Sequence, residues 1–120
     1  MRGEIVQLTT RKADAGLVIR IEETRIDAAV AIEFKEAVRN AAQRGGNPVI
    51  LDLSQVTFLD SSGLGAVVAV MKLLAPERTL ELAGLTPGVA RVFRLTRMDS
   101  VFTIHPGAPA ETDQPLKVAG

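Results

Sequence analysis

Residues 49–65 read VILDLSQVTFLDSSGLG, and this stretch decides the fold class. It begins with a short, mostly apolar run that suits a central strand covered on one or both faces. It ends in a polar corner, DSSG at residues 60–63, after which apolar residues recur at helical spacing to about residue 74. A strand, a sharp corner and a helix are therefore predicted in succession.

The segments on both sides extend this pattern to the order ββαβαβαβ. Periodicity and turn residues predict four more strands and two more helices. The strands are at residues 5–8, 17–22, 79–83 and 101–104, and the helices are at residues 28–44 and 87–95. Strands that alternate with helices indicate an α/β domain with parallel neighbours in a mixed sheet of about five strands, packed with three main helices. We expect one domain over residues 4–104 and an irregular, proline-rich tail over residues 105–120.

Composition excludes several classes of function. The 120 residues include 14 basic and 14 acidic side chains, so the excess of positive charge typical of nucleic-acid binding is missing. With no cysteine and a single histidine, His105, no Cys- or His-based metal site is expected, and no cofactor either. The N-terminus lacks an apolar signal segment, and the apolar run at residues 66–71 is far shorter than the about 20 residues that span a bilayer. A cytoplasmic protein that does not insert into membranes is expected.

The corner allows two interpretations. Asp60 or Ser61 is suited to cap the helix, and a cap alone accounts for DSSG. A helix N-terminus also stabilises anions, and Gly63 and Gly65 remove side chains from the first turns, so a phosphate or a partner's backbone could come close. A nucleophilic role for Ser61 has little support, because a serine needs a base and the hydrolase G-x-S-x-G spacing is missing. No enzyme is expected.

The predicted helix after the corner is apolar on all sides. One stripe should face the sheet, and it consists of Leu64, Val67, Val68, Met71 and Leu74. The remaining positions, Ala66, Ala69, Val70 and Leu73, are apolar as well. Either another element covers this second face, or it is a partner-binding surface.

Residues 49–65 resemble the signature of the STAS domain, and most of all that of bacterial anti-sigma factor antagonists. The resemblance extends over residues 4–104. It implies that a serine kinase of the anti-sigma class, which brings the ATP, phosphorylates Ser61. The unphosphorylated form would sequester that kinase and so regulate a sigma factor or a related partner-switching output, and a metal-dependent serine phosphatase would reverse the mark.

The resemblance also implies a partner surface around the corner. Asp27 matches a family aspartate before the first helix, and Asp60 matches the acid beside the phosphoacceptor. With the apolar face added, the expected partner-binding residues are Asp27, Asp60, Ser61, Ser62, Gly63, Gly65, Ala66, Ala69, Val70 and Leu73.

Two departures from the family pattern affect this surface. Glu23 and Thr24 stand where small residues are common, and the tail lacks the amphipathic helix of many relatives. The missing helix could leave surface open to a second copy, so a weak homodimer is one expectation. The alternative function is an accessory subunit of a membrane lipid transporter or a stress-complex scaffold, with the serine only a helix cap. A more distant one is a nucleotide or small-ligand binder at the helix N-terminus.

Overall fold

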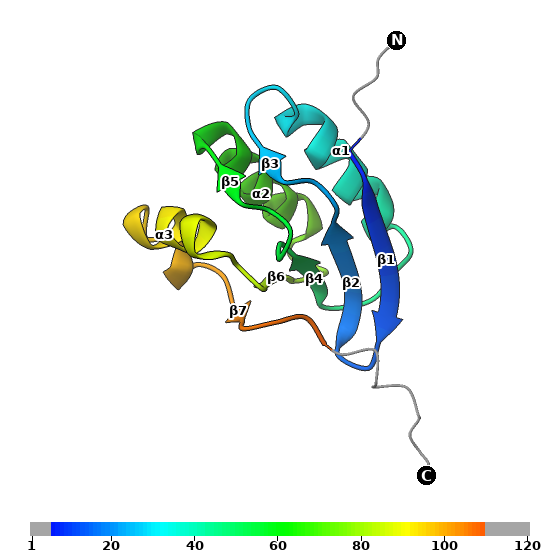
Figure 1. The fold of residues 1–120 in the computed structure, drawn as a ribbon. Helices are drawn as coiled ribbons and strands as arrows, with labels where there is room; N and C mark the ends of the chain where they lie inside the picture. Colours follow the sequence, from blue (N-terminus) through cyan, green and yellow to red (C-terminus); the bar gives the residue numbers. More distant parts are fainter. Residues whose placement is uncertain (1–5, 110–120) are drawn as a thin grey trace.

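The computed structural model describes residues 6–109, which form a five-stranded sheet with helices packed on one face (Figure 1). The strands of this sheet are β1 (Leu8–Ala13), β2 (Gly16–Ile21), β4 (Val49–Asp52), β6 (Leu80–Ala83) and β7 (Ile104–His105). The helices are α1 (Ala31–Ala42), α2 (Ser61–Leu74) and α3 (Pro87–Leu95), and a short 3₁₀ helix covers Met98–Ser100. Two further strands, β3 (Arg25–Ile26) and β5 (Phe58–Leu59), pair with each other outside the main sheet.

The order of strands in the sheet is β1-β2-β4-β6-β7. β1 and β2 form an antiparallel hairpin, and all later neighbours are parallel. Parallel neighbours need crossover connections, and α1, α2 and α3 lie in those connections along the chain. The predicted α/β class, the mixed sheet and the three helices are confirmed.

The core lies between the sheet and the helices. Leu17, Ile19 and Ile21 of β2 alternate with residues of the opposite face, and all three are buried. They pack in one cluster with Phe34 of α1 and Val67 of α2. The opposite face of the sheet has a small apolar cluster of its own, and its buried members are Val18, Ile50 and Ala83.

Three predicted boundaries are wrong. The first strand is β1 at Leu8–Ala13 and not residues 5–8, because its pairing with β2 continues to the turn at residues 14–15. The first helix begins at Ala31 and not at residue 28, because residues 28–30 form a separate turn. The last strand is β7 at Ile104–His105 and not residues 101–104, because the 3₁₀ helix and a turn occupy the preceding residues. β7 pairs with β6 through His105, so the sheet ends one residue beyond the predicted limit of the domain.

Candidate functional site

Two short parallel strands bring the corner and the loop before α1 together. β3 pairs with β5 in the register Arg25 to Phe58 and Ile26 to Leu59. Asp27 and Asp60 each follow directly after their strand, and parallel strands point their carboxyl ends the same way. The two acidic residues expected at the site therefore lie at the same edge of this small sheet.

Asp60 caps α2 and also binds the loop before α1. Its Oδ1 accepts a hydrogen bond from the Gly63 N–H at 2.9 Å, which is the cap. Its Oδ2 accepts one from the Ala28 N–H at 3.2 Å. Of the two residues that the sequence offered as the cap, the structure therefore selects Asp60.

Ser61 and Ser62 occupy the first two positions of α2, and both side chains are exposed. Neither hydroxyl makes a hydrogen bond with any residue from 6 to 109, and the same holds for their backbone N–H groups. Such N–H groups at a helix start, together with the helix dipole, favour a negative charge. The corner can therefore accommodate a phosphate on Ser61 without breaking any bond seen within the described chain.

The two glycines of the first turns have different roles. A Cβ on Gly63 would lie 2.1 Å from the carbonyl oxygen of Ile26, so this glycine lets α2 pack against β3. Gly63 is buried, and the backbone that approaches it belongs to this chain and not to a partner, contrary to the expectation. Gly65 is exposed, and a Cβ there would meet nothing within 4 Å. Of the two, only Gly65 leaves open space beside the corner.

Asp27 does not cap α1, although an aspartate directly before the helix predicted from residue 28 is typical of an N-cap. Its Oδ1 accepts a hydrogen bond from the Ala29 N–H at 3.1 Å, and its carbonyl accepts one from Val30 at 3.0 Å. These bonds close a turn at residues 28–30, after which the helix begins without a side-chain cap. Asp27 is thus held beside the corner by turn chemistry.

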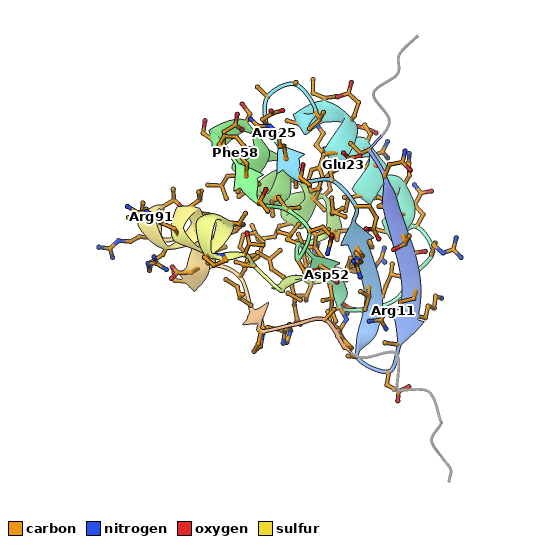
Figure 2. All side chains as sticks on the ribbon, viewed as in Figure 1. Arg11, Glu23, Arg25, Asp52, Phe58 and Arg91 are labelled. Atoms are coloured by element: carbon orange, nitrogen blue, oxygen red, sulfur yellow. The ribbon has the colours of Figure 1, made fainter. Side chains whose placement is uncertain are left out.

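Sequence reasoning missed Arg25 and Phe58. The Arg25 guanidinium lies over the Phe58 ring, 4.2 Å from its centre, and the two are side by side in Figure 2. The Arg25 Nε also pairs with the Asp27 Oδ2 at 3.3 Å. The signal was a repeated pattern, Arg25-Ile26-Asp27 and Phe58-Leu59-Asp60, in which an exposed residue and a buried one precede each aspartate.

The expected apolar partner face of α2 is only partly exposed. Ala66 and Val70 are 7% and 0% exposed and belong to the buried side of α2 with Gly63, Val67 and Leu74, so their placement on a partner surface is wrong. Ala69 is half-buried, and Leu73 is 52% exposed. At the corner the structure leaves Ser61, Ser62 and Gly65 open, with Arg25 and Phe58 on the two short strands before it. Leu73 is exposed at the opposite end of α2.

Two further observations limit what this part of the chain can do. Within residues 6–109, no group of three or more His, Cys, Asp or Glu side chains is placed to hold a metal ion. No helix in the same range is long and apolar enough to cross a bilayer.

The STAS domain family model matches residues 7–109, a range that includes the five-stranded sheet, the three helices and the serine corner. The chain belongs to this family. The Listeria monocytogenes anti-sigma-B factor antagonist is 34% identical over 80 residues, which cover 66% of this chain and 70% of that protein.

Solved structures agree on the fold. An anti-sigma factor antagonist from Mycobacterium paratuberculosis superimposes with a TM-score of 0.73 at 24% identity and covers 88% of this chain and 89% of that one. The Bacillus cell fate determinant SpoIIAA, in its phosphorylated form, superimposes with a TM-score of 0.58 at 22% identity, covering 90% of this chain and 94% of that one.

Proposed function

We propose that this chain is an anti-sigma factor antagonist whose binding to an anti-sigma serine kinase is switched by phosphorylation of Ser61. It acts in the cytoplasm as a binding protein and as the kinase's substrate, and it is not an enzyme. The names of the curated relatives support the class of function. The observation that supports a phosphoacceptor at this corner is that its serine hydroxyls are exposed and make no hydrogen bond with residues 6–109.

Asp60 and Ser61 have separate roles at the corner. Because Asp60 caps α2, the Ser61 hydroxyl has no structural role within the described chain and is open to solvent. This division favours the switch over the alternative in which the serine is only a helix cap. Ser62 is equally exposed, so exposure alone does not select between the two serines. The position directly after the aspartate, as the family pattern implies, selects Ser61.

The chemical step requires nothing catalytic from this chain. The Ser61 Oγ forms a bond to the γ-phosphorus of ATP held by the kinase, and the bond from that phosphorus to the ADP oxygen breaks. The hydroxyl proton passes to a base of the kinase. A serine phosphatase returns the hydroxyl by hydrolysis.

The negative charge of the phosphate is what would switch kinase binding. A phosphoserine carries about −1.5 to −2 charges at neutral pH, and it would stand beside Asp60 and near Asp27. The N-terminus of α2 stabilises this charge while the domain is alone, by about 0.3–1 kcal/mol. A partner docked on the corner would have to desolvate it, so the phosphorylated form should bind less tightly without any change of fold.

The proposed docking surface is smaller than the apolar face that the sequence predicted. It comprises the corner, the Arg25–Phe58 pair and the exposed end of α2 at Leu73. Phe58 is 40% exposed and lies flat beneath a guanidinium, so this pair offers both apolar area and charge to a partner.

The test uses an anti-sigma serine kinase from the same organism, with ATP, and maps the phosphate by mass spectrometry. Ser61→Ala should abolish phosphorylation. Ser62→Ala is the matched control, because Ser62 is adjacent and equally exposed, and it should accept phosphate at Ser61 as the native chain does. Phosphate on Ser62 in the native chain, or none on either serine, would overturn the proposal.

A further inference from the structure

A cavity of about 490 Å³ lies on the sheet face away from α1 and α2, apart from the serine corner. Strands β1, β2 and β4 form its floor, and Ala108 and Pro109 border it where the chain returns across the sheet. Arg11 of β1 and Asp52 of β4, both labelled in Figure 2, lie on opposite sides of β2. The volume is in the range of small-molecule sites.

The register of the strands explains why polar groups gather here. Thr9 pairs with Arg20 across β1 and β2, and Arg20 pairs with Asp52 across β2 and β4. Paired residues of neighbouring strands point to the same face, so these three side chains form one row. A second row, which contains Arg11 and Val18, lies beside it.

Asp52 is the unusual member of the cavity wall. It is 7% exposed, and its Oδ1 accepts a hydrogen bond from the Ser54 N–H at 2.9 Å. Its Oδ2 has no partner among residues 6–109. Arg20, its neighbour in register, pairs with Glu22 at 3.2 Å instead. The Oδ2 is not among the fully buried side-chain atoms without a partner, so it is open to the cavity and can accept a hydrogen bond from a ligand cation.

The charges of the wall define the ligand. Arg11 already donates to the Pro109 carbonyl, whereas Arg20 and Asp52 bring one charge of each sign to the cavity, so the wall favours a ligand that carries both signs. No group of three metal-ligating side chains exists within residues 6–109, which argues for an organic cation. Arg20 uses its Nε for Glu22, and its Nη groups have no partner in the described chain. They are free to bind a carboxylate in bidentate fashion.

The distance between the strands that carry Arg20 and Asp52 restricts the class of ligand further. Arg20 and Asp52 stand on adjacent strands, about 4.8 Å apart at the backbone, which suits the short distance between the ammonium and carboxylate of one α-amino acid. Val18 and Ala108 offer apolar wall for its side chain. From this geometry we infer that the cavity binds a free α-amino acid, with its ammonium on the Asp52 Oδ2 and its carboxylate on Arg20. This inference is independent of Ser61 phosphorylation.

The experiment titrates the full ¹⁵N-labelled chain with each of the twenty α-amino acids at millimolar concentration and follows the amide resonances. Shifts at Thr9, Arg20 and Asp52 are expected with at least one of them, and calorimetry then gives its Kd. The deaminated acid and the decarboxylated amine of that amino acid should each bind roughly tenfold more weakly or worse, because each leaves a charged group of the wall without its partner.

Asp52→Asn is the variant of choice, because it keeps the oxygen that accepts from Ser54 and removes only the charge. It should weaken binding roughly tenfold or more. The control is Glu36→Gln on α1, whose exposed carboxylate pairs with Arg39, and it should leave the Kd unchanged. No resonance shift with any of the twenty, equal binding of the amine or the acid, or equal Kd values for Asp52→Asn and the native chain would overturn the inference.

Discussion

Replacing Gly63 with alanine should destabilise the domain, although the same change usually favours a helix. The added Cβ would lie 2.1 Å from the Ile26 carbonyl oxygen, whereas ordinary contacts begin at 3.4 Å. α2 and β3 would have to separate by more than an ångström, against the bonds that Asp60 makes to Gly63 and Ala28. Overpacking of this kind costs more than the helix propensity gained, so we expect a net loss of about 2–3 kcal/mol.

Gly65→Ala is the matched control, because it lies two residues further along the same helix and its Cβ would meet nothing within 4 Å. It should stabilise the domain by about 0.5–1 kcal/mol, since alanine restricts the unfolded chain more than glycine does. Urea unfolding followed by circular dichroism measures both changes. If Gly63→Ala were as stable as Gly65→Ala, the close packing of α2 against β3 would be refuted.

Three other substitutions test the site. Asp60→Ala should lower the free energy of unfolding by about 1–2 kcal/mol, because it removes the α2 cap, and Asp60→Asn should lower it less. Equal losses of the two variants in urea unfolding would contradict a capping role. Val70→Ala should cost about 2 kcal/mol and Leu73→Ala no more than about 0.5, because Val70 is buried and Leu73 is exposed. Similar values would mean that Val70 lies on an open surface. Arg25→Gln should lower the free energy of unfolding by no more than about 1 kcal/mol, through loss of the contact with Phe58. It should also weaken kinase binding, as measured by calorimetry. Unchanged binding would show that the Arg25–Phe58 pair is not part of the docking surface.

Local signals in the sequence predicted most of the architecture. The proline at the first position of α3 and the periodicity behind it predicted residues 87–95, which the structure confirms. The corner predicted the start of α2 correctly, because a cap, two glycines and an apolar run are all local features. Periodicity predicted the second strand at residues 17–22, within one residue of β2 at both ends.

The remainder depended on contacts between distant segments. β3 and β5 contain two residues each, too few to show a period, and they exist because their backbones pair across more than thirty positions of sequence. The buried side of α2 contains Ala66 and Val70, and Leu64, Val68 and Met71 are only partly buried. The sequence could not show this, because a helix that is apolar on all sides has no period that selects the side facing the core. Asp27 looked like a helix cap, since a residue that closes a turn and one that caps a helix use the same side-chain acceptor.

The most direct test of the central claim is the affinity of the cognate anti-sigma serine kinase for this chain before and after stoichiometric phosphorylation of Ser61, measured by calorimetry without ATP. A phosphate that must be desolvated beside Asp60 should weaken binding by roughly tenfold or more, and treatment with a serine phosphatase should restore the original Kd. Equal affinity of the two forms would contradict the switch.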